Sequence, residues 1–586
     1  MGIIKYICVV RFFIVFILFS STFSLGQRFF FLPNLDSIDQ NYRSGGRALD
    51  STDHSVIRNI NLRPGGGYFG IYEFDLPLNV FHSIAGLTYL NYQFRAKPLF
   101  SGLPHLGFNY SFGSFGSQEL NVAYNQFFKP ETHLHINIHR VDMAGALRNS
   151  GHELNDINAL FYHSRKRIAM KLDVYYASYD IYENQGILTD TLLDFFPIEF
   201  TPVKSQNGNT KIKKSNIRWD NYLRLIGDSI SGQGIKLNTQ FDLVNREYEE
   251  QNFSGLAYNT ILIDSFSTRD QYQTASIETG GGYFFNSPYF RLDASVNHRF
   301  WKYQNLGQFR DTNEVRVNSI LSLRLGQLVC MNEFSINLLG AIGEFHYQSN
   351  INYTRNKLAI NAGFNLENKL PVPHQRFYLA NNISWKLSNL ELQKIMNVHG
   401  KMSYGQHQKL ISFLNWTTVS NGLFLIQNEW RQDTLDFINL GTIGLMGQFR
   451  FGKFSVYPCA RLNFSSNNFN FMPSFTTLNR IAFTTKLFKT KALEVSLGSD
   501  FGYDSKYNHL TYNHLTGTMD PILSAFQTPG MMNLHSFMSF QISQFRFYVR
   551  AENIDYFWNA KQIRIDPGFP LMPFYLRLGL SWDFFN

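Results

Sequence analysis

The sequence predicts an all-β protein: a single antiparallel transmembrane β-barrel of about 20 strands, within a range of roughly 16 to 24, with long external loops and short periplasmic turns. Three observations predict it. Segments of about ten residues alternate apolar and polar side chains along most of the chain. The connections between these segments are alternately short and long. Aromatic residues make up 16% of the 586 residues and gather near the segment ends.

Composition excludes several other classes of protein. Hydrophobic residues make up 44% of the chain and charged residues 17%, which is too apolar for a disordered protein. The 53 basic and 44 acidic residues give a formal net charge of +9. After Gly26 no apolar run is long enough for a transmembrane helix. Only Cys330 and Cys459 follow Gly26, and two cysteines support neither a disulfide framework nor a cysteine-based zinc site.

The N-terminus has the pattern of a secretory signal peptide. Lys5 and Arg11 precede the apolar run from Phe12 to Phe19, and small residues up to Gly26 suit a signal peptidase. We therefore expect residues 1–26 to be a cleaved signal peptide that directs the chain to export.

The exported chain is expected to have two parts. Residues 27–89 are polar and glycine-rich and are expected to form a periplasmic segment, and residues 90–586 the barrel. About 60 residues ahead of the barrel are too few for a folded plug domain, which argues against a TonB-driven receptor.

Residues 132–140 show the alternation clearly. Leu134 and Ile136 fall on one face, and polar side chains such as His135 and Asn137 fall on the other. In a transmembrane barrel the apolar face contacts lipid and the polar face lines the lumen. A soluble two-layer sandwich would show the same alternation, so it stays open as an alternative. Segment lengths of about 10 to 14 residues favour the barrel, because strands of soluble sheets average about 5 to 6 residues.

Aromatic residues near the segment ends are expected to form the interfacial girdles of the barrel. They are Trp301, Tyr303, Tyr347, Trp385, Trp416, Phe584 and Phe585. Short turns are expected near residues 163–166, 227–234 and 286–288, and long external loops near residues 144–155, 180–215, 249–270 and 504–532.

The C-terminal residues form the most regular segment. Apolar side chains alternate with Tyr575, Arg577, Gly579, Ser581 and Asp583 up to the end of the chain. The alternating apolar residues are Phe574, Leu576, Leu578, Leu580, Trp582 and Phe584. This pattern resembles the terminal-strand signal that outer-membrane barrels present to the barrel assembly machinery.

Short motifs occur in a characteristic order along the chain. They include Leu78-Asn79-Val80-Phe81-His82, Lys97-Pro98-Leu99-Phe100, Tyr182-Glu183-Asn184-Gln185-Gly186-Ile187, Ala551-Glu552-Asn553 and Pro567-Gly568-Phe569-Pro570. Together they resemble the putative porin family of outer-membrane proteins, from about Asp75 to Asn586. The resemblance implies an outer-membrane barrel and brings no functional residues with it. It is weaker from Leu387 to Leu440, where the strand register stays open.

Charged and histidine side chains on the expected lumen face are the candidate functional residues, because a passing solute would meet them. They are His133, His135, His139, Lys171, Asp173, Arg316, Arg324, Arg577 and Asp583. Histidines at i and i+2 can chelate a metal, but the sequence places no further ligand beside them, so a polar strip is the preferred interpretation. Since no nucleophile motif or triad is found, we expect no catalytic residue, no cofactor and no enzyme activity.

Two glycine motifs are not assigned a function. Gly65, Gly67 and Gly70 spell G-x-G-x-x-G, but no strand–helix context surrounds them, so a flexible turn is expected there. The string Gly280-Gly281-Gly282 is interpreted as a chance repeat or a strand kink.

The expected function is passive diffusion of small solutes or ions through a polar lumen in the cell outer membrane. The alternative is a barrel with a plugged lumen that serves as a structural, adhesive or secretion-associated component. The expected surroundings are outer-membrane lipid and lipopolysaccharide, and the sequence leaves a homo-oligomer open. Nucleic acid is not expected as a partner of an exported barrel.

Two neighbouring substitutions test the assignment of the lipid and lumen faces. Ile136→Arg should impair assembly, because a cation facing lipid at mid-depth costs about 2–4 kcal/mol. Asn137→Arg should be tolerated on a wet lumen face. Equal tolerance of the two variants, measured by heat-modifiable gel migration, would contradict the assignment of the faces.

Overall fold

The computed structural model describes residues 98–586 apart from a few short stretches. The exceptions are residues 190, 228–230, 252–257, 259, 406–408, 427–428, 434–436, 467–472, 509, 522–526, 559–563, 567, 571–572 and 586. The expected signal peptide, the 27–89 segment and the glycine motif at 65–70 lie outside the described residues. No helix in the described part is long and apolar enough to cross a membrane.

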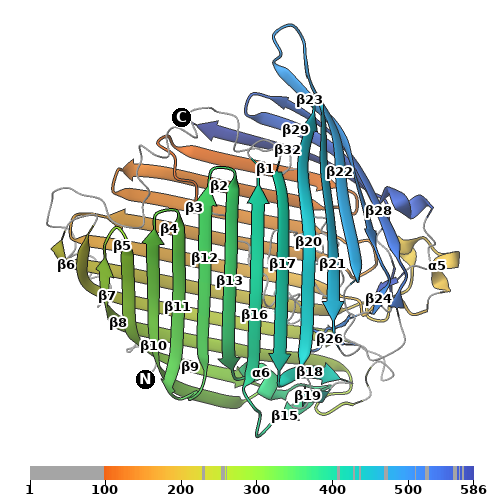
Figure 1. The fold of residues 1–586 in the computed structure, drawn as a ribbon. Coiled ribbons are helices and arrows are strands. Elements are labelled where there is room, and N and C mark those ends of the chain that lie inside the picture. Colours follow the sequence, from red (N-terminus) through yellow and green to blue (C-terminus); the bar gives the residue numbers. More distant parts are fainter. Residues whose placement is uncertain are drawn as a thin grey trace.

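Twenty-two strands form one closed antiparallel sheet (Figure 1). They are β1 (His105–Gly113), β2 (Gln118–Lys129), β3 (Thr132–Met143), β4 (His152–Ser164), β5 (Ile168–Glu183), β6 (Gly208–Gly227), β7 (Gly232–Gln251), β8 (Ser267–Asn286), β9 (Phe290–Asn305), β10 (Gln308–Leu325), β11 (Leu328–Leu339), β12 (Phe345–Arg355), β13 (Leu358–Lys369), β16 (Gln393–Tyr404), β17 (Lys409–Ser420), β20 (Ile438–Phe451), β21 (Phe454–Ser465), β22 (Phe475–Leu487), β23 (Leu493–Asp504), β28 (Met531–Ile542), β29 (Phe545–Glu552) and β32 (Tyr575–Phe585).

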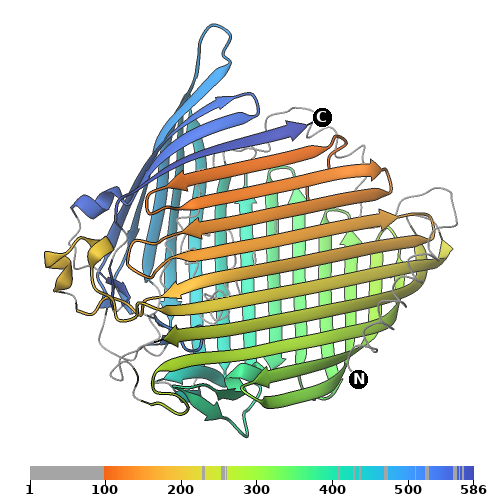
Figure 2. The same ribbon diagram turned by 180° about the vertical axis from the view of Figure 1, so that it is seen from behind.

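Each barrel strand pairs with the next one along the chain, and the last pairs with the first. The β1–β32 ladder runs from His105 opposite Phe585 to Gly113 opposite Arg577. Strands on one side of the barrel cross those on the other side at a steep angle, as the tilt of a closed sheet requires (Figure 2). The predicted all-β barrel of about 20 strands is confirmed, with 22 strands.

The two ends of the barrel differ. At one end, which also holds the start of β1 and the end of β32, strands are joined by two to five residues. The longer connections lie at the opposite end. Because barrels of this class have short periplasmic turns and long external loops, we assign the loop end to the outside.

Most of the smaller elements belong to these outer loops and gather along one rim in Figure 1. They are α5 (Leu192–Phe195), η1 (Ile198–Phe200), α6 (Pro373–Arg376), β14 (Phe377–Leu379), β15 (Ser384–Lys386), β18 (Gly422–Ile426), β19 (Glu429–Asp433), β24 (Tyr507–Asn508), β25 (Leu510–Asn513), β26 (Thr518–Pro521), β27 (Gln527–Thr528), η2 (Ile554–Phe557), β30 (Arg564–Asp566) and β31 (Phe569–Pro570). The hairpin β18–β19 interrupts the alternation within residues 387–440, where the sequence left the register open, and the hairpin β14–β15 lies just before that range.

The two faces of the sheet have opposite character. On β7, Leu237 is 48% exposed and faces outward, whereas the neighbouring Lys236 is 8% exposed and faces the lumen. This alternation follows from the side-chain period of two along a strand.

Three of the aromatic residues assigned to the girdles lie elsewhere, so that part of the prediction is wrong. Tyr303 is fully buried, and the Trp301 indole donates to Glu314 at 2.6 Å, so both point inward from β9. Trp385 belongs to the β14–β15 hairpin and stacks on Tyr378. Trp301 and Tyr303 lie at the outer end of β9, where inward aromatic side chains contact the loops. Trp416 does face outward and is exposed.

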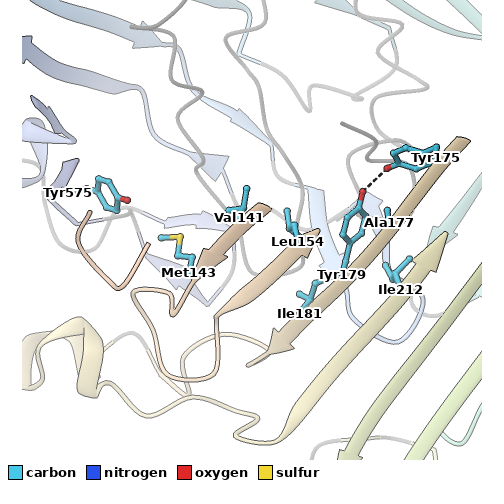
Figure 3. Packing of buried hydrophobic residues seen from close by; sticks show 9 residues of the cluster. All are labelled: Val141, Met143, Leu154, Tyr175, Ala177, Tyr179, Ile181, Ile212 and Tyr575. Carbon is cyan, nitrogen blue, oxygen red and sulfur yellow. Dashed lines mark hydrogen bonds between the residues drawn. The ribbon is translucent and has the colours of Figure 1, made fainter. Parts of the chain in front are cut away.

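An apolar cluster packs on the inner side of β3–β6 and β32 near the outer end (Figure 3). It contains Val141, Met143, Leu154, Tyr175, Ala177, Tyr179, Ile181, Ile212 and Tyr575. The interior is therefore packed along this part of the wall.

The same packing corrects one expectation from the sequence. Asn137 lies on the polar face, but its side chain is fully buried, and its amide donates to Asn121 at 2.7 Å. An arginine has no room there, so Asn137→Arg is a poor control for the lipid-facing variant.

Strand β12 offers a better matched pair. Ile351 is exposed on the outer face, whereas the adjacent Asn350 is only half-buried on the inner face. Ile351→Arg should destabilise the folded barrel by about 2–4 kcal/mol, and Asn350→Arg by less than about 1 kcal/mol. Urea unfolding of the two variants in lipid vesicles measures the difference. Similar losses in both would contradict the assigned faces.

Candidate functional site

One side of the lumen wall carries a row of buried charges. Arg480 of β22 and Arg550 of β29 both bind Asp500 of β23, with N···O distances of 2.5 and 2.8 Å. Arg550 also lies 3.4 Å from Glu552, which lies 3.1 Å from Arg577 of β32. The signs alternate along the row, so each buried charge has a neighbour of opposite sign.

The row continues across the junction of β32 and β1. Arg577 lies 3.6 Å from Glu119 of β2, and Glu119 lies 3.2 Å from His139 of β3. His139 in turn lies 3.6 Å from Asp156 of β4, which also accepts a hydrogen bond from the Tyr175 hydroxyl at 2.5 Å. We call the eight side chains from Arg480 to Asp156 the charge belt. Its members form ion pairs with one another, and these pairs connect the side chains of neighbouring strands on this side of the lumen.

The three histidines of the expected polar strip are buried on β3. His133 Nε2 lies 3.2 Å from the Leu99 carbonyl oxygen, and the His135 ring lies 2.7 Å from the Asn125 amide oxygen. His139 belongs to the charge belt. The described residues contain no group of three or more His, Cys, Asp or Glu side chains that could hold a metal ion.

The other expected lumen residues occupy inward positions at different depths. Asp173 of β5 accepts a hydrogen bond from the Asn158 amide at 3.1 Å, and the Lys171 ammonium lies 5.9 Å from the centre of the Tyr162 ring. The remaining four are Arg577 in the charge belt, Asp583 paired with His105 at 2.8 Å, Arg324 exposed at the periplasmic end of β10, and Arg316 in the pocket described next.

A pocket of about 390 Å³ opens on the inner wall of β6–β12, away from the charge belt. Its described lining includes four basic and four acidic side chains together with amide and hydroxyl groups. The charged members are Arg218, Lys236, Arg299, Arg316, Asp242, Glu278, Asp293 and Glu333. Among the described lining residues only Ile320 and Phe334 are apolar. We call this the lumen pocket.

Ion pairs fix the charged side chains of the lumen pocket. The Arg218 Nε donates to Asp220 at 2.9 Å. On the other flank, Arg299 and Arg316 share Glu314, with N···O distances of 3.7 and 3.8 Å. These cations remain partly exposed, so they keep contact with the lumen.

Two glycines of β8 pack closely against residues that line the lumen pocket. A Cβ atom at Gly280 would overlap the Asn297 Oδ1 and lie 2.9 Å from the Asn238 Oδ1, and one at Gly282 would overlap the Ala294 carbonyl oxygen. Strand β8 pairs without interruption on both sides. The glycines therefore serve close packing across β8, and neither ladder shows a register shift at the expected kink.

Four outer loops meet on the inner face of β7–β9. They connect β5 to β6, β7 to β8, β13 to β16 and β23 to β28, and we call them the cap. Arg246 of β7 donates to the carbonyl oxygens of His514 and Leu515, and the Leu515 contact is 2.9 Å long. The Tyr378 hydroxyl donates to the same Leu515 oxygen at 3.2 Å. The β23–β28 loop thus reaches across the mouth to the far wall.

Further contacts fix the other cap loops to the same strands. The Tyr303 hydroxyl donates to the Phe377 carbonyl oxygen at 2.7 Å. Glu250 of β7 accepts hydrogen bonds from Ser205 and from Tyr258, which belong to two different loops. The outer end of β7 is therefore the common anchor of the cap. It lies on the same strand as the lumen pocket, closer to the outside of the cell.

Two cap histidines are held neutral. Burial lowers the pKa of His514 to about 3, and the positive charges of Arg246 and Lys204 lower it further in the same direction. Burial beside Arg246 lowers the pKa of His374 to about 4. The His514 ring contacts Tyr248, and the His374 ring stacks on Tyr272.

The sequence analysis missed the cap anchors and the close packing across β8. The only signal for this packing was the glycine triplet inside a strand, since glycine in a strand interior often marks a close backbone approach. Arg246 and Leu515 carry no local signal, because their contact joins residues 269 positions apart.

Arg246→Ala should loosen the β23–β28 loop, because two carbonyl acceptors lose their charged donor. We expect hydrogen exchange of the backbone amides at 513–517 to accelerate about 10- to 100-fold, with the barrel strands unchanged. Arg269→Ala on the outer face of β8 is the matched control, since its ion pairs are exposed. Unchanged exchange in Arg246→Ala would show that the loop is held by other contacts.

The cap should weaken in acid. The closed cap holds His374 and His514 neutral, whereas released histidines titrate near 6.5, so protons favour the released state as pH falls from about 6.5 toward 4. Each histidine contributes at most about tenfold per pH unit. Exchange rates at 513–517, corrected for intrinsic chemistry, should rise between pH 7 and 5. The double variant His374→Gln with His514→Gln should flatten this rise, and an equally steep rise there would contradict the assignment.

Comparisons with known proteins agree with the barrel. The sequence matches a protein-family model described as putative porin over residues 103–586. A search of curated proteins finds no match. Among solved structures, the FrpB iron transporter from Neisseria meningitidis (F3-3 variant) aligns with a TM-score of 0.56 and 11% identity, covering 83% of this chain and 82% of that chain.

Two further structures show the same likeness. The siderophore receptor PirA from Acinetobacter baumannii aligns with a TM-score of 0.56 and 9% identity, covering 83% of this chain and 81% of that one. The copper transporter OprC aligns with a TM-score of 0.58 and 7% identity, covering 84% and 82%. At these identities the likeness shows the fold alone. The family match and the closed 22-strand barrel together place the chain in the putative porin family, as an outer-membrane β-barrel protein.

Proposed function

We propose that the protein lets small polar solutes cross the outer membrane by passive diffusion along the wall of the lumen pocket. The route enters between the cap loops, passes the mixed charges of β6–β12 and leaves among the short periplasmic turns. No turnover chemistry and no cofactor takes part.

The lumen pocket is the observation that carries this proposal. It combines paired charges, free volume and partly exposed cations on one wall, whereas the charge belt makes the opposite wall tightly packed. Mixed charges on a wet wall interact with ions and dipolar solutes while resisting apolar ones. A pathway restricted to one wall would be narrower than the barrel itself.

A second candidate is selective uptake of a bound ligand. The cap favours it, because four loops meet at one aromatic anchor and would present a recognition surface to the outside. Solved structures with a similar fold include an iron transporter, a siderophore receptor and a copper transporter. Such uptake would saturate with solute concentration, whereas passive diffusion would not.

Liposome swelling separates these functions. Liposomes that contain the refolded protein should swell in arabinose and glycine at rates that fall with solute size and stay proportional to the concentration gradient. Saturating rates would instead favour selective uptake. Absence of swelling from protein shown by heat-modifiable migration to be folded would contradict passive diffusion and favour the plugged structural barrel.

A further inference from the structure

We infer that aromatic side chains on two outer loops bind the outer leaflet of the membrane and hold the β5–β6 loop against it. These side chains belong to the α5–η1 segment of the β5–β6 loop and to the η2 segment of the β29–β32 loop. We call them the aromatic patch, and its members are Phe195, Phe196, Phe200, Phe557 and Trp558. The inference goes beyond the proposed function, since it concerns the outside of the barrel and not its lumen.

The aromatic patch is exposed, although the loops that carry it are fixed. Exposure reaches 78% at Phe195. Beneath the rings, Leu193 of α5 shares a buried cluster with Phe569 of β31, and the Ile187 amide donates to the Gly568 carbonyl oxygen at 2.8 Å. The gold α5 and the dark-blue η2 accordingly lie side by side in both views (Figures 1 and 2). Exposed rings gathered on a fixed framework mark a binding surface.

Strand lengths place η2 at the outer lipid interface. Strand β29 has 8 residues and β32 has 11, whereas a tilted strand needs about 9–11 residues to cross the bilayer. Since β29 ends at Glu552 and η2 begins at Ile554, η2 lies where the wall leaves the membrane. On the other side of the barrel β7 and β8 have 20 residues each, so their loop stands well beyond the membrane.

The aromatic patch also continues the lipid-facing surface of the barrel. The Phe557 ring contacts the Phe574 ring, with centroids 5.2 Å apart. Phe574 directly precedes β32, and Leu576 on that strand is 41% exposed on the outer face. A side-chain period of two gives Phe574 and Leu576 the same face. The apolar outer wall therefore extends from β32 onto η2 without a break, and this continuity identifies lipid as the partner.

Two acidic side chains limit the depth of the contact. Asp194 and Glu199 are exposed beside the rings of Phe195 and Phe200. A carboxylate is costly in the hydrocarbon core, so these rings lie at the boundary between headgroups and acyl chains. Aromatic side chains concentrate at this boundary in membrane proteins. The contact is with acyl chains near the headgroups, so it depends on no particular headgroup.

Binding of the aromatic patch to lipid fixes the β5–β6 loop from two sides. Inside the mouth, Ser205 of this loop donates to Glu250 of β7, which anchors the cap. Outside the barrel, the rings of α5 and η1 rest on the outer leaflet. The membrane thus restrains one of the four cap loops.

A spin label on the aromatic patch tests the inference. The exported chain with Cys330→Ala and Cys459→Ala is labelled at Phe195→Cys and refolded into vesicles of phosphatidylethanolamine and phosphatidylglycerol. The matched control is a label at Phe266→Cys, because Phe266 is 76% exposed on the β7–β8 loop. The ratio of oxygen to nickel-chelate accessibility should be at least about threefold higher at position 195, because oxygen concentrates in lipid and the chelate stays in water.

Two results would overturn the inference. Equal ratios at positions 195 and 266 would show that the aromatic patch faces water. A label at position 195 that is shielded from both oxygen and the chelate would show that protein covers the patch. Dipolar broadening between labels would then identify a second copy of the chain as the occupant.

A pair of double variants tests whether the two loops act together. Phe557→Ser with Trp558→Ser should lower the ratio at position 195 at least about twofold, because membrane binding scales with buried apolar area. Ile263→Ser with Phe266→Ser removes two exposed side chains from the β7–β8 loop and should leave the ratio unchanged. All four side chains are exposed, so both variants should fold, which heat-modifiable migration checks. An unchanged ratio in the first variant would contradict a patch shared by α5 and η2.

Discussion

The hydrogen-bond ladder between β1 and β32 is the constraint on which the whole structure depends. A strand in lipid cannot leave its N–H and C=O groups unpaired, so the sheet must close on itself. Side chains reinforce this junction from within. His105 of β1 pairs with Asp583 of β32, and Arg577 of β32 reaches Glu119 of β2 beyond β1. The charge belt thus passes over the closing strands and connects the first and last strands of the barrel.

Closure also decides where free space remains inside the barrel. The charge belt and the apolar cluster fill one side of the interior, whereas β6–β12 keep free volume beside paired charges. Strands β6, β7 and β8 each have 20 residues, about twice what a tilted strand needs to cross the bilayer. Their extra length carries the anchor of the cap beyond the membrane. The cap and the lumen pocket therefore lie one after the other along the same strands, with the cap at the outer end.

The sequence was sufficient for the barrel and for the inward facing of polar side chains on clearly alternating strands, because a strand has a period of two. Lys171, Asp173 and Arg316 lie on inward positions for this reason. The alternation does not show how deeply a side chain is buried or how closely its neighbours pack around it. Asn137 and Tyr303 both face inward and are fully buried, since other strands and loops cover them. Contacts such as Arg246 with Leu515 depend on the closed barrel bringing distant segments together, which no local pattern encodes.

The central claim is that this barrel holds a continuous polar route from the outer loops to the periplasm. Single-channel recording of the full-length exported chain in a planar bilayer, with a salt gradient across it, tests that claim most directly. The account predicts discrete and stable conductance steps with weak selectivity between cations and anions, because the charges of the lumen pocket are balanced. Silence from protein shown to be folded and inserted would contradict it.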